Sequence, residues 1–140
     1  MTKLAPVNAL MGPADDNPVE PAVVAVVDDD PRVLEALQDL LEAVGLNVRL
    51  YTSAEALLES DGLVGIDCLI TDIGLPIMDG SELKRVAKNE RPELPVLLIT
   101  GRHELAKRQL SRGQPPEELF RKPFASEELL AAVFRSIRRA

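Results

Sequence analysis

The sequence predicts a doubly wound α/β domain, in which a five-stranded parallel sheet in the order 2-1-3-4-5 lies between two layers of helices. Short apolar runs of strand length alternate with segments in which apolar residues recur at helical spacing. The apolar runs are rich in Val, Leu and Ile, as expected of parallel strands buried on both faces. The length of 140 residues suits one domain, and aromatic residues are so few that aliphatic side chains must build its core.

Residues 1–21 are predicted to form a disordered leader, because they carry four prolines and no hydrophobic period. The folded domain is expected over residues 22–140. Its strands are expected at 22–27, 46–51, 66–71, 95–100 and 119–121, and its helices at about 31–44, 54–59, 80–89, 103–112 and 126–138.

Local signals set the ends of these helices. Asp30 is a plausible N-cap with Pro31 in the first turn behind it, and Gly45 is a helix stop. Ser53 and Ser126 are expected to cap the second and the last helix.

Polar side chains follow four of the predicted strands. Asp28 and Asp29 follow the first strand, Asp72 the third, Thr100 ends the fourth and Lys122 follows the fifth. The carboxyl ends of parallel strands share one edge of the sheet, and ligands bind there at the point where the strand order reverses. With strands one and three as neighbours, we expect the three carboxylates to meet.

Three adjoining carboxylates repel one another unless a cation neutralises them. Oxygen ligands with open positions for water and phosphate suit Mg²⁺, which also neutralises phosphoryl oxygens during transfer. Thr100 could donate a hydrogen bond to a phosphoryl oxygen, and Lys122 could add a point charge. Each residue alone also has a structural explanation, as a helix cap, a turn former, a strand exit or a surface lysine. Their joint placement at successive strand ends favours a site.

These residues resemble the receiver domain of two-component response regulators over about residues 22–138. The matching pieces are Val26-Val27-Asp28-Asp29-Asp30, Asp72-(x)3-Pro76-(x)2-Asp79-Gly80, Thr100-Gly101 and Lys122-Pro123-Phe124. The intervals agree as well, with 44 residues from Asp28 to Asp72, 28 more to Thr100 and 22 more to Lys122. The spacing looks most like receivers of the nitrogen-fixation regulator type.

The resemblance implies a flavodoxin-like receiver fold in which Asp72 accepts a phosphoryl group from a sensor histidine kinase or a phosphotransfer protein. It implies Mg²⁺ bound by Asp29, Asp72 and the backbone carbonyl of Gly74, with Asp28 acting mostly through water. Thr100 would move as a switch and Lys122 would contact the phosphoryl group, next to a Lys122–Pro123 bond that is commonly cis. No enzyme activity is implied beyond self-catalysed transfer to Asp72 and autodephosphorylation. The fourth helix, fifth strand and fifth helix would form the signalling face.

Two departures from the family pattern concern that face. Leu119 stands where the family usually carries an aromatic residue, and Phe120 comes one place later. Residues 113–118 contain two prolines where small residues are usual, which would shorten or displace the helix before them. We expect the phosphoryl chemistry to survive both departures.

The composition argues against nucleic-acid binding and against insertion into a membrane. The net charge of −7 argues against nucleic-acid binding, and no apolar run approaches a membrane span or a signal-peptide core. We expect a soluble, cytoplasmic, stand-alone receiver with a protein target that the sequence does not name. A second copy of the chain is another candidate partner.

Cys68 lies within an apolar run and is expected in the core.

Two other functions stay open from the sequence. A degenerate receiver could act only as a protein-interaction scaffold, as Leu119 and the two prolines suggest. A phosphatase of the haloacid-dehalogenase type would use Asp28 as nucleophile and Asp30 as acid, but Pro31 and the lack of an inserted cap domain argue against it.

Overall fold

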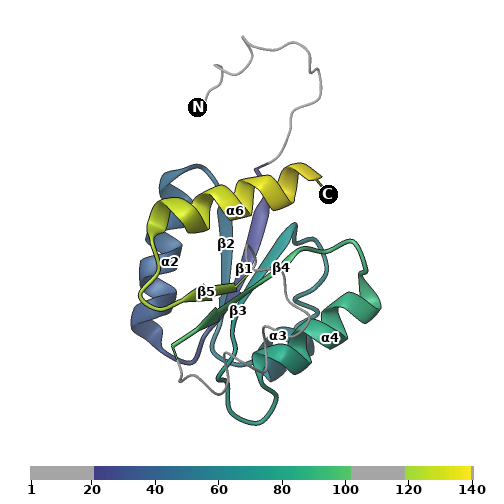
Figure 1. Ribbon diagram of the computed structural model, residues 1–140. Helices are drawn as coiled ribbons and strands as arrows, with labels where there is room; N and C mark the ends of the chain where they lie inside the picture. The colour runs from purple at the N-terminus through teal and green to yellow at the C-terminus, as the bar shows by residue number, and fades with distance from the viewer. Residues whose placement is uncertain (1–20, 102–118, 140) are drawn as a thin grey trace.

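The computed structural model describes residues 21–101 and 119–139. Within these ranges, five parallel strands form one sheet in the order β2-β1-β3-β4-β5, which confirms the predicted doubly wound fold (Figure 1). The strands are β1 (Val23–Val27), β2 (Asn47–Tyr51), β3 (Cys68–Asp72), β4 (Val96–Thr100) and β5 (Leu119–Arg121).

The helices of the described ranges lie on both faces of this sheet. They are α2 (Pro31–Ala43), α3 (Ala54–Glu59), α4 (Gly80–Glu90) and α6 (Ser126–Arg139). The pair α2 and α6 covers one face, and the pair α3 and α4 covers the other (Figure 1). The helix predicted at 103–112, the proline-containing stretch at 113–118 and the leader up to residue 20 lie outside the described residues.

Most of the expected helix ends are confirmed. The Asp30 side chain accepts a hydrogen bond from the Arg32 amide at 2.9 Å with Pro31 opening α2, and Gly45 takes a φ of 91° just past its end. The assignment of Ser126 as an N-cap is wrong by one residue. Ser126 is the first residue of α6, because the first helical hydrogen bond runs from the Leu129 amide to the Ala125 carbonyl at 3.1 Å.

Alternate residues of the central strands enter two aliphatic clusters, because successive side chains of a strand point to opposite faces. On one face Val27, Leu69 and Leu98 pack under α3 and α4. On the other face Val26 and Ile70 pack under α2 and α6, with Cys68 buried among them. Every residue of β3 and β4 is buried, so the polar residues at their ends stand on a rigid support.

None of the helices in the described ranges has the length and apolar character that crossing a membrane demands.

Candidate metal and phosphoryl-acceptor site

The carboxyl edge of the sheet brings together residues from four strands. Asp28 follows β1 directly, and Asp72 is the last residue of β3, one place past the pairing of Val27 with Thr71. Thr100 ends β4, and Lys122 follows β5. The predicted gathering of these residues at one edge follows from the parallel register.

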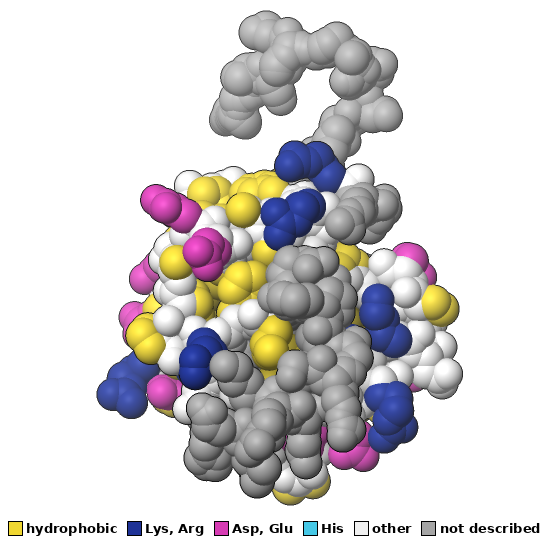
Figure 2. Space-filling model, viewed as in Figure 1, with side chains coloured by type: hydrophobic (Ala, Val, Ile, Leu, Met, Phe, Trp, Pro, Cys, Tyr) yellow, Lys and Arg dark blue, Asp and Glu magenta, His cyan; other side chains and the backbone are white. Residues whose placement is uncertain are grey.

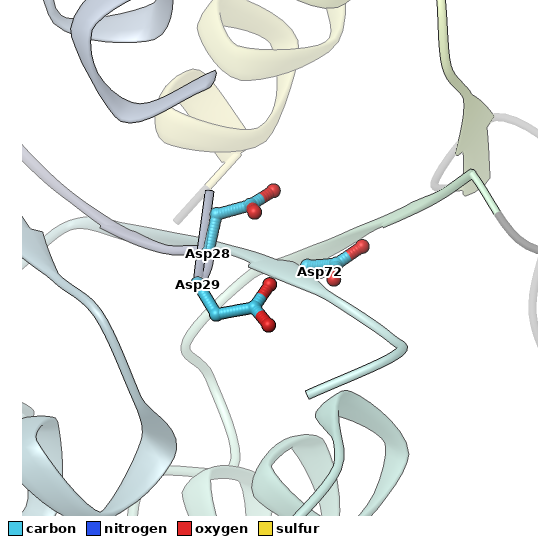
Figure 3. Close-up of side chains that lie close together, drawn as sticks. All are labelled: Asp28, Asp29 and Asp72. Carbon is cyan, nitrogen blue, oxygen red and sulfur yellow. The ribbon is translucent and has the colours of Figure 1, made fainter. Parts of the chain in front are cut away.

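Three carboxylates point into the same space from β1 and β3 (Figure 3). One oxygen each of Asp28, Asp29 and Asp72 lies within 4.8 Å of the others. Asp28 and Asp72 are buried, with 1% and 4% of their surface exposed, whereas Asp29 is exposed. The group is therefore closed at its base and open toward solvent on one side.

Lys122 places its ammonium group against this cluster. Its Nζ lies 2.9 Å from Asp28 Oδ2 and 3.4 Å from Asp72 Oδ1. The Lys122 amide donates to the Thr100 carbonyl at 2.8 Å, which ties the residue to the end of β4. A Cβ atom at Gly101 would come within 3.1 Å of Lys122 Cδ, so the side chain passes closely over that glycine. The Lys122–Pro123 peptide bond is cis.

The carboxylates and the lysine change each other's titration. Burial, and then the neighbouring Asp28 charge, raise the pKa of Asp72, although Lys122 opposes both. Burial lowers the pKa of Lys122, but Asp28 and Asp72 outweigh that effect, so that it lies above its ordinary value. The lysine compensates the acidic cluster only in part.

The donor set fits a hard divalent cation. Within residues 21–101 and 119–139, the buried Asp28 Oδ2 accepts no hydrogen bond, and its ion-pair partner is the Lys122 ammonium at 2.9 Å. A buried carboxylate oxygen that accepts no hydrogen bond has capacity for a further partner, which a cation or a water bound to one would supply. Carboxylate oxygens of this kind suit Mg²⁺.

The remaining predicted site residues lie at the rim and base of the same edge. Thr100 is buried, with 1% of its surface exposed. Gly74 is half-buried, two residues past Asp72, in the loop that joins β3 to α4. The loop closes through a hydrogen bond of 2.9 Å from the Gly80 amide to the Ile73 carbonyl. A Cβ atom at Gly80 would collide with the Asp72 carbonyl oxygen, which explains the glycine after Asp79.

Asp30, the third residue of the acidic run, has a different task. Its carboxylate caps α2 and lies 3.4 Å from Arg32 Nε, and these contacts lower its pKa. A carboxylate occupied in this way is a poor proton donor, so the geometry gives the phosphatase alternative no support. An opening of about 780 Å³ lies beside the cluster, and its lining residues come from the acidic run, α2 and the ends of β3, β4 and β5: Asp29, Asp30, Arg32, Val33, Ala36, Asp72, Gly101, Lys122, Pro123 and Phe124.

One residue near the site was not identified from the sequence. Glu55, in the first turn of α3, accepts a hydrogen bond of 3.0 Å from the Met78 amide in the β3–α4 loop. The two residues are 23 positions apart, and Glu55 resembles any surface acid in a short helix. The sequence therefore carries no local signal for this contact.

Comparison with known proteins identifies the family. The model of the response regulator receiver domain matches residues 24–134. Response regulator protein TmoT of Ectopseudomonas mendocina is 33% identical over 119 residues, which cover 85% of this chain and 54% of that protein. Transcriptional regulatory protein FixJ of Bradyrhizobium diazoefficiens is 28% identical over 117 residues, which cover 84% of this chain and 57% of that protein.

Solved structures agree with this result. A response regulator receiver domain protein from Clostridium thermocellum has a TM-score of 0.74 at 28% identity, covering 84% of this chain and 95% of that chain. The chain spans about half the length of the curated relatives it matches, 54% of TmoT and 52% of TodT from Pseudomonas putida. The family match, the sheet order and the acidic edge have one explanation: the chain belongs to the response regulator receiver domains of two-component systems.

Proposed function

We propose that this receiver domain is a Mg²⁺-dependent phosphoacceptor switch. In it, Asp72 takes a phosphoryl group from a phosphohistidine on a sensor histidine kinase or a phosphotransfer protein. The observation that carries the proposal is the position of Asp72, buried at the end of β3 with Asp28, Asp29 and Lys122 around it. The proposed receiver unit spans residues 22–140 and works in the cytoplasm.

In the proposed reaction a carboxylate oxygen of Asp72 attacks phosphorus. The new P–O bond forms as the P–N bond to the donor imidazole breaks, and the imidazole leaves with a proton from solvent. In this proposal the Lys122 ammonium, 3.4 Å from Asp72 Oδ1, neutralises a phosphoryl oxygen, and the Thr100 hydroxyl, at the end of β4, donates to another. Loss of the group to water would reset the switch.

The proposed metal ligands are Asp29, Asp72 and the backbone carbonyl of Gly74, with Asp28 acting through water. The buried Asp28 Oδ2 atom, which accepts no hydrogen bond within the described residues, supports a cation or its water shell at this place. When bound, Mg²⁺ neutralises charge on the phosphoryl oxygens during transfer. The strands β1 and β3 position the carboxylates that would bind the cation.

The proposed output face combines β5, α6 and the helix predicted at 103–112. Hydrophobic side chains gather on the visible face over α6 and β5 (Figure 2). A hollow of about 480 Å³ on this face would offer a protein target both apolar and charged contacts; it is lined by Leu119, Phe120, Arg121, Pro123, Phe124, Ala125, Glu128, Ala131 and Arg135.

The test is labelling by acetyl phosphate, a small phosphodonor that needs no partner protein. Intact-mass analysis of wild type should show one added phosphoryl group when Mg²⁺ is present and none after chelation. The Asp72→Asn variant should stay unlabelled. Asp61→Asn is the matched control, because Asp61 is exposed and has a φ of 57°, which asparagine tolerates.

Full labelling of Asp72→Asn would reject Asp72 as the acceptor. A wild-type chain that neither takes up the group nor responds to Mg²⁺ would reject the switch and leave the scaffold alternative.

A further inference from the structure

The loop between β3 and α4 is built around an unfavourable backbone conformation. Ile77 has a φ of 67°, and 91% of its surface is exposed. A β-branched residue in the left-handed region costs of order 1–3 kcal/mol and persists only where its surroundings impose it. Because the side chain faces solvent, contacts of its neighbours must impose it.

The next residue, Met78, supplies those contacts. Its side chain packs against the core cluster under α3 and α4. Its amide donates a hydrogen bond of 3.0 Å to Oε2 of Glu55, which is half-buried in α3. The base of the loop is fixed separately, by the bond from the Gly80 amide to Ile73 and by Asp79 as the cap of α4. The Glu55 contact therefore acts on the middle of the loop, next to the strained residue.

The same loop carries Gly74, two residues past Asp72. The backbone carbonyl of Gly74 is a proposed metal ligand. A backbone carbonyl can serve as a ligand only if the loop holds it in place, and groups behind metal ligands commonly tune affinity in this way. A carboxylate acceptor forms a stronger bond to a backbone amide than a neutral oxygen does. Glu55 thus has both the location and the chemistry to set the position of this ligand.

Building on the proposed function, we propose that Glu55 is a positioning residue for the metal and phosphoryl-acceptor site. Its carboxylate holds the Met78 amide, keeps Ile77 in the left-handed conformation and so fixes the loop that follows Asp72. Glu55 acts through the loop and contacts neither the metal nor the phosphoryl group.

The experiment compares Glu55→Ala, Glu55→Gln and the control Glu59→Ala, which removes an exposed acid from the same helix. In the metal-free protein, hydrogen exchange at the Met78 amide should be about tenfold faster in Glu55→Ala than in wild type. Mg²⁺ affinity, measured by nuclear magnetic resonance titration, should fall by about tenfold in Glu55→Ala. Glu59→Ala should match wild type in both measurements.

Glu55→Gln separates the hydrogen bond from the charge. Its side-chain oxygen can still accept from Met78, so its Mg²⁺ affinity should stay within about threefold of wild type. A loss as large as that of Glu55→Ala would mean that the charge acts directly on the cation, which overturns a role through the loop. Retention of full Mg²⁺ affinity and a protected Met78 amide in Glu55→Ala would also overturn it.

A second variant tests the role of backbone strain. Glycine takes a positive φ without cost, so Ile77→Gly removes the need for an outside hold on this residue. The loss of Mg²⁺ affinity caused by Glu55→Ala should therefore be smaller in the Ile77→Gly background than in wild type. Equal losses would overturn the link to Ile77. The same comparison remains usable if Glu55→Ala folds poorly, because Ile77→Gly relieves the loop.

Failure of the proposed function gives a different result from failure of this inference. A wild-type chain without Mg²⁺ binding or Asp72 labelling would overturn both. A wild-type chain with both activities, together with an unaffected Glu55→Ala variant, would overturn the positioning role alone.

Discussion

The proposed function of Asp72 and its surroundings have opposite effects on the ionisation of its side chain. In its proposed role as a nucleophile it must be ionised, yet burial and the Asp28 charge raise its pKa. Lys122, 3.4 Å away, relieves this conflict only in part. In the metal-free site, the ionised form of this proposed acceptor therefore costs the fold stability.

The stability of the Asp72→Asn variant tests this argument. The pKa of Asp72 is raised from its ordinary value of 3.8 in the folded chain, so the folded chain binds this proton more tightly than the unfolded chain does. As pH rises from 3.8 through the raised value, the free energy of unfolding of wild type falls, and the full loss is present above it. In metal-free buffer at neutral pH, Asp72→Asn should be more stable than wild type by about 1 kcal/mol.

The measurement is urea unfolding of both proteins in chelator across the acidic to neutral range. Their difference should shrink as pH falls, because a protonated Asp72 is nearly isosteric with asparagine. An Asp72→Asn variant that is less stable than wild type at neutral pH would contradict the sign.

At the level of single elements, the strands and most helix ends could be predicted because their signals are local. The short, uninterrupted apolar run of β4 predicts a buried strand. Its expected start at residue 95 differs from the observed Val96 by one position. β3 was expected to end at residue 71 but continues through Asp72, because that residue still pairs with Ile99 of β4. A pairing across strands cannot be seen in one segment alone.

Substitutions of Asp30 test whether this residue only caps α2 or also takes part in the proposed reaction at Asp72. Asp30→Ala should cost about 1 kcal/mol, because the Arg32 amide loses its acceptor. Labelling of Asp72 by acetyl phosphate should continue at the wild-type level. Asp30→Asn keeps an acceptor and serves as the control, with stability close to wild type. Loss of labelling in either variant would place Asp30 in the reaction.

The segment between α3 and β3 is held by a contact that no sequence pattern announces. Arg91 Nη1 donates to the carbonyls of Leu63 at 2.7 Å and Ile66 at 2.8 Å. Both residues are buried, so Arg91→Ala would leave two carbonyls without their donor. We expect a loss of about 2 kcal/mol in the free energy of unfolding, measured with denaturant.

Arg85→Ala is the matched control for Arg91→Ala. Its side chain is 72% exposed and lies 3.6 Å from Glu82, a surface pair expected to contribute less than about 0.5 kcal/mol. Equal losses in the two variants would refute the role given to Arg91.

The strand β5 bears on the departure at Leu119. Leu119 packs toward the cluster under α3 and α4, whereas Phe120 packs toward the cluster under α2 and α6. An aromatic residue moved by one place in a strand lies on the opposite face of the sheet. Phe120 therefore cannot substitute for the missing aromatic side chain at 119.

Across the whole molecule, the gathering of the acidic site was predictable because topology alone determines it. Once strands one and three are neighbours in a parallel sheet, Asp28 and Asp72 must share an edge. The side-chain details were not predictable. The 2.9 Å contact between Lys122 and Asp28, and the hold of Glu55 on Met78, depend on segments far apart in the chain. Sequence patterns report periods within a segment, and these contacts join segments.

The stability of the whole fold should respond to Mg²⁺ in a way that screening by salt cannot reproduce. A cation that binds the folded chain and not the unfolded chain adds about 2.7 kcal/mol at a concentration a hundredfold above its dissociation constant. For a domain of this size, that is a rise of roughly 10 °C in the unfolding midpoint.

Thermal unfolding of wild type should therefore show this rise with MgCl₂ and little of it with NaCl at equal ionic strength. The rise should be reduced in Asp29→Asn and nearly absent when Asp28 and Asp29 are both replaced by asparagine, because one oxygen of each belongs to the cluster around Asp72. Removing the two aspartates also relieves repulsion, so that the double variant should start from a higher midpoint in chelator. An equal rise with NaCl, or an unchanged rise in the double variant, would show that the acidic edge is a charged surface and not a metal site.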